Sequence, residues 1–418
     1  MKIFILGCGG VGACAAALFA RERDVEKILV GDMNLARANK LVQALKGLNV
    51  SVETEAIEVD GTRQDDVARA AEGVDFIYNA TVPKCNIPIL KACIKVGASY
   101  VDAAAFPPFV PSIPEEETIP ALMALDGDAK SAGITAITCL GIAPGWSNIA
   151  ANYIISQMDS AEKARFKWFN YVEANDLVGT WWPAALMEEF LGGPHPIIWE
   201  NGEFKAVDLL KGAEIYEYPE PIGKRTAYTA IFHPELWMLP TFLPDGRGKS
   251  LKYIDMMGGM DIGDLKMKDV WIEAIHRQTV KPAFEKAIRG PEDMFEALGS
   301  SFNAPSDFKE AFDNGIIKND HNTTVVEVTG LKNGKKIKHT MGNTSSFSDS
   351  RKIAPWSSSV SYATSQPGVT IGLMVLRGEI NRKGVIVPDQ LEQPELILRK
   401  LASEIVILTE KIEREFSG

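Results

Sequence analysis

The chain opens on an unbroken apolar run, Ile3 to Leu6, that leads directly into the glycine-rich stretch 7–12. An apolar run of this length before closely spaced glycines is typical of a buried parallel strand that ends in a tight turn and opens a helix. A helical stretch of small apolar residues, 13–21, and a second apolar strand, 28–31, follow. The pattern predicts a β-α-β unit at the N-terminus.

The same alternation of short apolar runs and amphipathic stretches continues to about residue 148. We expect further strands at 50–59, 74–80, 97–104 and 134–140, and helices at 64–71, 88–96 and 121–132. Strands that alternate with helices of this length indicate parallel β-α-β units. The sequence therefore predicts an α/β fold whose first domain, residues 1–148, is a Rossmann-type doubly wound parallel sheet.

Beyond residue 148 the pattern changes to longer alternating strands joined by Trp- and Pro-rich connections. A strand is expected at 166–172, and Asn333-Gly334 between two alternating runs predicts a β-hairpin, because this dipeptide tolerates positive φ. These features indicate an α+β domain inserted at 149–350. In the C-terminal segment, 351–418, we expect an apolar helix at 368–378 and a last helix with an apolar stripe at Leu398, Leu401, Ile405, Leu408 and Ile412.

The glycine-rich stretch reads G-x-G-x-x-G, and Asp32 follows Gly12 by twenty positions at the end of the second strand. In a dinucleotide-binding unit the glycines allow the tight turn and the approach of the pyrophosphate, and the acid accepts hydrogen bonds from the adenosine ribose. At the end of the third strand, Asp60 would contact the adenine edge, although it would almost equally suit a turn, and at the end of the fourth strand Asn79 and Ala80 would lie beside the nicotinamide. The predicted cofactor-binding residues are Gly7, Gly9, Gly10, Val11, Gly12, Asp32, Asp60, Asn79 and Ala80.

Asp32 also bears on the choice of cofactor. A carboxylate at this position repels a 2′-phosphate and favours NAD, whereas Arg37 and Lys40 on the following helix leave NADP possible.

Composition limits the partners and the compartment. A net charge of −11 argues against a nucleic-acid or anionic membrane surface, because such binding relies on clustered Lys and Arg. The five cysteines lie in apolar segments without paired spacing, and the five histidines are scattered, so we expect reduced thiols and no metal. There is no signal-peptide pattern and no apolar run of membrane-spanning length. We therefore expect a cytoplasmic protein with a small-molecule substrate.

Several ordered blocks of the chain resemble the saccharopine dehydrogenase family along nearly its full length. They are the glycine motif 7–12, Tyr78-Asn79-Ala80, Tyr100-Val101-Asp102, the turn 144–148, His233-Pro234-Glu235, the stretch 376–380 and Gly384-Val385. Within the family, Ala143-Pro144-Gly145 and Thr180-Trp181-Trp182-Pro183 look like the lysine 6-dehydrogenase branch.

The resemblance implies a Rossmann-type domain completed by the C-terminal segment, an inserted substrate-binding and dimerisation domain, and a homodimer. It implies an NAD(P)-dependent oxidoreductase that acts on a C–N bond of an amino acid such as saccharopine or lysine, by hydride transfer through an imine. Two alternatives remain open. One is a C–N bond-forming polyamine enzyme of the carboxynorspermidine dehydrogenase or homospermidine synthase type, and the other is a non-catalytic NAD-binding redox sensor.

The catalytic candidates are Asp102, at the tip of the fifth strand, and His233. Asp102 would hold the cationic substrate nitrogen or relay its proton, although it would equally suit a helix cap. His233 would serve as an acid or base near neutral pH, although a His before Pro is more often a loop residue. The candidate substrate-binding residues, each with an alternative role in the core or in a surface ion pair, are Trp146, Trp182, Arg225 and Tyr228.

Overall fold

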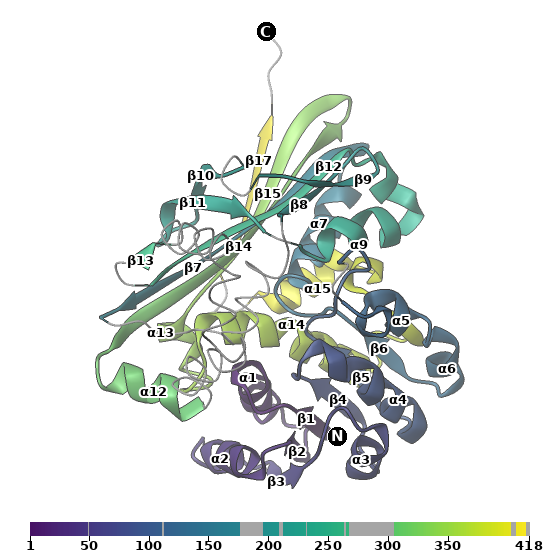
Figure 1. Ribbon diagram of the computed structural model, residues 1–418, viewed down its shortest axis with the longest axis vertical. Coiled ribbons are helices and arrows are strands. Elements are labelled where there is room, and N and C mark those ends of the chain that lie inside the picture. Colours follow the sequence, from purple (N-terminus) through teal and green to yellow (C-terminus); the bar gives the residue numbers. More distant parts are fainter. Residues whose placement is uncertain are drawn as a thin grey trace, which may run out of the picture.

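The protein is described from a computed structural model, which shows two sheets with helices between them and around the first (Figure 1). The structure describes residues 1–48, 50–110, 113–175, 195–208, 212–230, 232–262, 265–266, 305–402 and 407–414.

The first sheet contains seven described strands, all parallel, in the order β16-β6-β5-β4-β1-β2-β3. The strands are β1 (Lys2–Leu6), β2 (Lys27–Asp32), β3 (Glu53–Glu58), β4 (Phe76–Asn79), β5 (Ser99–Asp102), β6 (Thr135–Ile137) and β16 (Gly384–Ile386). The strands are short, and all except the edge strand β3 are mostly buried, because helices cover both faces of the sheet. The predicted Rossmann-type sheet is confirmed.

Helices pack on both faces of this sheet. They are α1 (Gly10–Phe19), α2 (Leu35–Lys46), α3 (Gln64–Ala70), α4 (Asn86–Val96), α5 (Ile119–Met123), α6 (Asp126–Ser131) and α14 (Ser359–Leu376), with short turns η1 (Pro83–Cys85) and η2 (Glu115–Glu117). The single helix expected at 121–132 is broken into α5 and α6. The break places Asp126 at the start of α6, where its carboxylate accepts a hydrogen bond from Val385 N–H of β16 at 3.0 Å.

The predicted last helix is wrong in its second half. The helix α15 (Pro394–Leu401) ends at Leu401, and β17 (Ile407–Arg414) pairs antiparallel with the second sheet. Leu408 and Ile412 are four residues apart, and an even spacing puts two side chains on one face of a strand as well as on one face of a helix. The apolar spacing therefore did not discriminate between the two structures.

The second sheet is mixed, with ten described strands and the main order β10-β11-β12-β7-β14-β15-β17. Its strands besides β17 are β7 (Ser160–Ala174), β8 (Ile197–Glu200), β9 (Glu203–Ala206), β10 (Glu214–Tyr218), β11 (Gly223–Thr229), β12 (Tyr253–Ile262), β13 (Leu265–Lys266), β14 (Ile317–Lys332) and β15 (Lys335–Ser346). The predicted hairpin at Asn333-Gly334 is confirmed, since these residues have φ of 53° and 69° and join β14 to β15.

The two faces of the second sheet have different neighbours. On the inner face, Phe166 and Trp168 of β7 belong to the same core as Trp146 of α7 (Trp146–Ser156) and the helices of the first sheet. On the outer face, Phe169 packs with a separate cluster that contains Tyr218 and Met257. The space between the two sheets is also filled by α9 (Glu235–Phe242) and η4 (Pro388–Gln390), whereas α12 (Pro305–Asp313), α13 (Phe347–Ser350) and η3 (Pro244–Ser250) complete the described helices.

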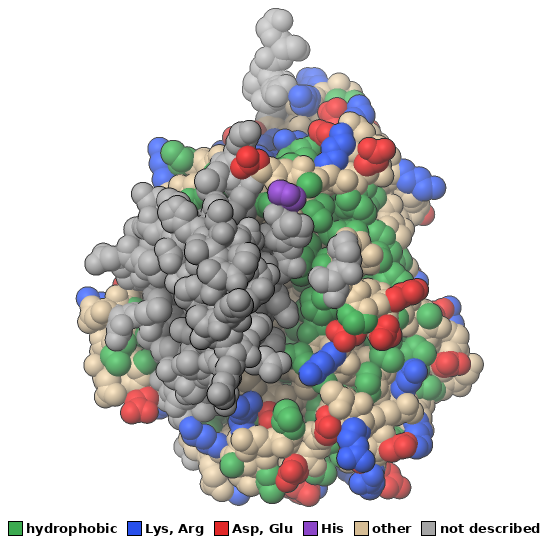
Figure 2. All heavy atoms as spheres, viewed as in Figure 1, with side chains coloured by type: hydrophobic (Ala, Val, Ile, Leu, Met, Phe, Trp, Pro, Cys, Tyr) green, Lys and Arg blue, Asp and Glu red, His purple; other side chains and the backbone are tan. Residues whose placement is uncertain are grey.

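The five cysteines are all buried and free. On the face shown in Figure 2, acidic and basic side chains are interspersed over the lower part of the molecule, and hydrophobic side chains gather beside the residues drawn in grey. Within the described part of the chain, no helix combines the length and the apolar character needed to cross a membrane.

Candidate functional site

The strand order of the first sheet reverses between β1 and β4, and ligands of such sheets bind in the crevice at this point, outside the carboxyl ends of the strands. Gly7 follows β1 with φ of 99°, and a Cβ on it would stand 2.7 Å from the carbonyl oxygen of Ala80, just after β4. Only glycine fits this close approach. The strand end after β1 therefore packs closely against the strand end after β4, as the predicted glycine motif requires.

The other motif glycines have separate roles. A Cβ on Gly12 would overlap the carbonyl oxygen of Gly7, and one on Gly10 would lie 2.5 Å from Ser361 Oγ at the start of α14. A Cβ on Gly9 would meet nothing within 4 Å, because Gly9 faces open space. Gly9, Gly10 and the half-buried Val11 thus present the first backbone N–H groups of α1 outwards, as an anion-binding helix start requires.

Asp32 is buried at the end of β2 and holds the glycine loop. Its Oδ2 accepts a hydrogen bond from Cys8 N–H at 2.9 Å, and its Oδ1 accepts one from Asn34 N–H at 2.9 Å. Burial raises the pKa of the Cys8 thiol; the charge of Asp32 adds to the rise and the charge of Arg37 opposes it. The charge of Arg37, in the first turn of α2, therefore acts on the loop that Asp32 holds.

The predicted contacts Asp60 and Asn79 are both engaged in local hydrogen bonds. Asp60 Oδ1 accepts from Thr62 N–H and Thr62 Oγ1 at 2.9 and 2.7 Å, and these bonds lower the pKa of Asp60. Asn79 Nδ2 donates to Asn86 Oδ1 at 2.8 Å and to the Tyr100 hydroxyl at 3.0 Å. Both residues shape the strand ends that form the crevice.

Asp102 ends β5 and is 1% exposed. Its Oδ1 accepts a hydrogen bond from Cys139 N–H at 2.8 Å, and its Oδ2 accepts one from the Tyr100 hydroxyl at 2.9 Å. Burial raises the pKa of Asp102 to about 7, although these hydrogen bonds act in the opposite direction. Asp102 is therefore a carboxyl group that changes protonation near neutral pH at the carboxyl edge of the sheet.

His233 lies just before α9 and pairs with Glu235, the first residue of that helix. The His233 ring nitrogen Nδ1 makes a short contact with Glu235 Oε2, and Glu235 Oε1 accepts a hydrogen bond from Ser147 Oγ at 2.7 Å. Glu235 is 0% exposed and His233 is buried. The arrangement, an imidazole oriented by a carboxylate, is one that acid–base catalysis uses.

A third buried acid, Asp389 of η4, comes from the C-terminal segment. Asn148 Nδ2 donates to both of its carboxylate oxygens at 3.1 Å, and Asn148 Oδ1 accepts from Gly145 N–H at 3.0 Å, which fixes the amide at the start of α7. Asp389 is 0% exposed, and burial raises its pKa to about 7, with a further contribution from Glu235.

The three acids Asp102, Glu235 and Asp389 are called here the buried acids. They influence the pKa values of neighbouring groups. Asp102 and Glu235 both contribute to raising the pKa of the Cys139 thiol, and Glu235 contributes to that of Asp389. Among the described residues, no Lys or Arg forms an ion pair with any of the three, and no His, Cys, Asp and Glu side chains are grouped to hold a metal ion. Asp102 and Asp389 are therefore buried without a Lys or Arg partner among the described residues, and Glu235 is paired with the His233 imidazole.

The buried acids predict the pH dependence of stability. A carboxyl whose pKa is raised on folding stabilises the protein below its ordinary pKa, and this contribution is lost as pH rises through about 7 for Asp102 and Asp389. We expect the free energy of unfolding of the unliganded protein to be lower at pH ~8 than at pH ~5, by on the order of 2 kcal/mol per group. The melting temperature should fall accordingly. In Asp389→Asn the decrease in stability between pH ~5 and pH ~8 should be smaller than in the wild type. The control Asp60→Asn, whose pKa is lowered on folding, should leave the slope in this range unchanged.

The predicted substrate-binding residues do not all lie near the buried acids. Trp146, which is fully buried, precedes Ser147 at the start of α7, and Tyr228 lies in the inner-face core. Arg225 pairs with Asp261 at 3.3 Å and lies over the ring of Tyr171 on the outer face. The structure therefore does not bring Arg225 to the buried acids. Trp182 lies outside the described residues.

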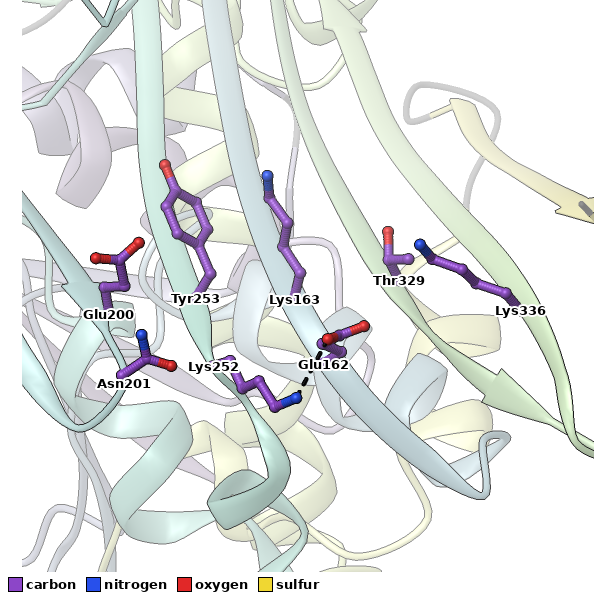
Figure 3. Close-up of a pocket in the computed structure, with 8 residues that line it drawn as sticks. All are labelled: Glu162, Lys163, Glu200, Asn201, Lys252, Tyr253, Thr329 and Lys336. Carbon is purple, nitrogen blue, oxygen red and sulfur yellow. Dashed lines mark hydrogen bonds and ion pairs between the residues drawn. The ribbon is translucent and has the colours of Figure 1, made fainter.

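A shallow groove of about 270 Å³ lies on the outer face of the second sheet (Figure 3). Lys163 extends over the ring of Tyr253 at 4.3 Å, and Lys252 pairs with Glu162 at 3.4 Å. Its other lining residues are Glu200, Asn201, Thr329 and Lys336. Because this groove lies on the face turned away from the first sheet, it is separate from the dinucleotide crevice.

Sequence reasoning missed Glu235 and Asp389 as functional residues. Asp389 follows the apolar run Val385 to Val387, so it repeats the pattern of an acid after a short strand that singled out Asp32 and Asp102. Glu235 follows His233 by two positions, but only the fold shows that it pairs with that imidazole.

Comparison with known proteins agrees with this geometry. Residues 3–137 match the family model of the saccharopine dehydrogenase NADP binding domain. The dinucleotide-binding domain is that of the saccharopine dehydrogenase family. The resemblance inferred from the sequence is thereby confirmed, as is the expectation of a nicotinamide dinucleotide, NAD or NADP, as cofactor.

Two curated relatives cover almost the whole chain. Carboxynorspermidine synthase of Vibrio cholerae is 25% identical over 431 residues, which are 96% of this chain and 95% of that protein. Carboxyaminopropylagmatine dehydrogenase of Synechocystis is 23% identical over 421 residues, with the same coverage of 96% and 95%. Together with the family model of residues 3–137, these similarities support an NAD(P)-dependent dehydrogenase.

Two solved structures share the fold. Apo saccharopine dehydrogenase (L-Glu forming) from Saccharomyces cerevisiae superposes with a TM-score of 0.68 at 15% identity, covering 99% of each chain. Homospermidine synthase from Legionella pneumophila, in complex with NAD, superposes with a TM-score of 0.63 at 13% identity, covering 96% of this chain and 88% of that one. The pairing of a Rossmann-type domain with a second mixed-sheet domain is thus the saccharopine dehydrogenase fold.

Proposed function

We propose that this protein is an NAD(P)-dependent enzyme of polyamine-type metabolism, which acts on the C–N bond between a cationic amine and a carboxyaminopropyl group. The names of both curated relatives describe compounds of this class, an amine that carries extra cationic groups and an amino-acid end. The observation in this chain that carries the proposal is the set of buried acids, Asp102, Glu235 and Asp389, without a Lys or Arg partner among the described residues.

Electrostatics explains why these acids suit such a substrate. A buried carboxylate without a counter-charge is costly, and it becomes protonated near neutral pH, as the raised pKa values of Asp102 and Asp389 indicate. A di- or polyamine supplies the missing positive charge. A cationic substrate would thus stabilise the charged forms of Asp102 and Asp389.

The reaction requires proton transfers that these residues can perform. When an amine adds to an aldehyde, the nitrogen loses a proton and the hydroxyl leaves as water, so that an imine forms; the bound dinucleotide then supplies the hydride that reduces it. We assign the proton transfers to His233, oriented by Glu235, and the positioning of the substrate nitrogen to Asp102. Asp389, which lies in the C-terminal segment, would contribute a negative charge that attracts the cationic substrate.

The cofactor within this proposal is NAD, with NADP as the alternative. Asp32 occupies the position that disfavours a 2′-phosphate, and it is already held by two backbone N–H groups. Arg37 lies in the first turn of α2, which follows Asp32, and is the residue that would accept NADP. Both reduced cofactors therefore belong in the assay.

A second candidate is an amino-acid dehydrogenase that acts on saccharopine or lysine, as the sequence resemblance implies. The observation that favours it is the shared fold with yeast saccharopine dehydrogenase. A homospermidine-type synthase, which would use NAD without net reduction, and a redox sensor without turnover are the remaining alternatives.

The test is a substrate panel with purified full-length protein. A carboxyaminopropyl group on nitrogen is the product of reducing an imine formed with 2-amino-4-oxobutanoate, so this aldehyde is combined with putrescine, 1,3-diaminopropane or agmatine and with NADH or NADPH. We expect loss of reduced-nicotinamide absorbance and a carboxylated polyamine by mass spectrometry. Oxidation of saccharopine or lysine with NAD(P), and no reaction with the aldehyde, would replace the proposal by the second candidate.

A further inference from the structure

A group of polar side chains is buried on the inner face of the second sheet. Asn322 and Thr324 lie on β14 and Asn343 lies on β15, and they are 5%, 1% and 1% exposed. Thr324 is directly opposite Asn343 in the antiparallel register, and Asn322 is opposite the next inner-face residue, Ser345. Cβ atoms in directly opposite positions are about 5 Å apart, so the three side chains form one group, called here the polar triad.

The polar triad lacks hydrogen-bond partners. Among the residues that the structure describes, none bonds to Asn322 Oδ1, to Thr324 Oγ1 or to either Oδ1 or Nδ2 of Asn343. The neighbouring Thr323, on the outer face, shows the usual arrangement, since its Oγ1 is 2.9 Å from Thr344 Oγ1. Native proteins leave very few buried polar groups unsatisfied, and those that remain call for an explanation. Four such atoms in one group indicate that something else binds them.

The triad faces the space between the two domains, next to the cofactor loop. On one side of it, Asp320 accepts a hydrogen bond from Ser359 N–H at 3.1 Å, and Ser345 Oγ donates to the Ser359 carbonyl oxygen at 3.3 Å, so the start of α14 lies there. Two residues further along α14, Ser361 contacts Gly10 of the glycine loop. On the other side, the next inner-face pair, Val326 and Met341, belongs to the core that includes Trp146 of α7.

The strands that carry the triad, β14 and β15, therefore contact both α14 and α7, the two helices that lead to the proposed site. The first turn of α14 touches the glycine loop, and the first turn of α7 carries Ser147 and Asn148, which bond to Glu235 and Asp389. Figure 1 shows both helices between the two sheets.

The donors and acceptors of the triad match an α-amino-acid group. Two amide oxygens can accept from an ammonium group, and a hydroxyl and an amide NH₂ can donate to a carboxylate. The choice of O and N in each amide is an assignment, and rotating the amide exchanges their positions without changing this set. Hydrogen bonds from neutral donors to a charged carboxylate are also stronger than those between neutral groups.

We propose that Asn322, Thr324 and Asn343 bind the ammonium and carboxylate of the substrate's amino-acid end, which makes them determinants of specificity. This inference rests on the proposed function, since it assigns the carboxyaminopropyl end to the triad and the cationic amine end to the buried acids. The enzyme then selects aldehydes that carry an α-amino-acid group over simple aldehydes.

The kinetic test compares Thr324→Val and Asn343→Leu with the control Thr323→Val, the same substitution one residue away on the opposite face. With 2-amino-4-oxobutanoate we expect the first two variants to lose about tenfold to a hundredfold in kcat/KM, because each loses a hydrogen bond to a charged group. With butanal, which lacks the amino-acid group, their kcat/KM should stay within about threefold of the wild-type value. Thr323→Val should behave as wild type with both aldehydes, and melting curves establish that all three variants are folded.

A binding measurement separates this inference from the proposed function. Calorimetry with NAD present compares L-2,4-diaminobutanoate, which has the amino-acid group, with 1,3-diaminopropane, which lacks the carboxylate. Wild-type binding of diaminobutanoate that weakens about tenfold or more in Thr324→Val and Asn343→Leu supports the triad even if no aldehyde is turned over, and in that case only the proposed reaction fails. Unchanged affinity for diaminobutanoate in both variants, or an equal loss for both ligands, overturns the assignment.

Discussion

Replacing His233 with asparagine should lower kcat by about 10²- to 10⁴-fold, the usual contribution of a positioned acid–base group. An asparagine amide can still donate to Glu235, so the hydrogen bond between these two positions is kept while the titratable group is removed. Because His233 is the proposed acid–base group, the variant should also show a pH–rate profile that differs from that of the wild type. The affinity for the dinucleotide should not change, since the glycine loop and Asp32 are untouched.

The chain offers a matched control at the edge of the second sheet. His339 is also buried and pairs with a glutamate, Glu410, at 2.7 Å between β15 and β17. His339→Asn removes the same kind of pair outside the proposed site, so kcat should stay near the wild-type value whatever happens to stability. Equal losses of kcat in His233→Asn and His339→Asn would contradict a catalytic role for His233.

The second large effect is expected in the glycine loop. There one alanine substitution should weaken dinucleotide binding and another should destabilise the fold. Gly9→Ala adds a methyl group that meets no protein atom within 4 Å, so the unliganded protein should melt as wild type. The methyl group would instead occupy the space of the pyrophosphate and should raise the Kd for NAD(H) at least about tenfold. Gly12→Ala forces a methyl group into the carbonyl oxygen of Gly7 and should destabilise the fold by about 1–3 kcal/mol.

Fluorescence titration with NADH and thermal melting of both variants check these expectations. Gly127→Ala serves as a control, because this glycine also has nothing within 4 Å but lies on α6, away from the loop. A Gly9→Ala variant that binds NADH as tightly as wild type would show that the dinucleotide does not approach the backbone at this position.

The connections between the domains explain why residues far apart in the sequence act together. The C-terminal segment supplies β16 to the parallel sheet, α14 beside the glycine loop and β17 to the mixed sheet. Asp389 lies on this segment and Glu235 lies in the second domain, yet both bond to adjacent residues of α7, Asn148 and Ser147. The two domains are thus joined at the proposed site rather than by a linker remote from it.

The sequence by itself determined the parallel domain and its cofactor loop. Unbroken apolar runs, glycines at fixed spacing and Asp32 at the next strand end depend on contacts within one β-α-β unit, so local pattern is sufficient to predict them. The same logic placed Asp102 at a strand tip. The hairpin at Asn333-Gly334 was predictable for the same reason, because a two-residue turn depends on its own backbone angles.

Only the tertiary structure decided the rest of the site. Pairing of β17 with β15 overrode an apolar spacing that suited a helix equally well, and the alternation of side chains along β11 put Arg225 on the outer face. Glu235, Asp389 and the polar triad come from three separate parts of the chain, and each residue alone is an ordinary polar position. The burial of the two acids, and the absence of hydrogen-bond partners for the polar triad among the described residues, arise in the space between the two sheets. No local pattern encodes that space, because it forms only when segments hundreds of residues apart pack together.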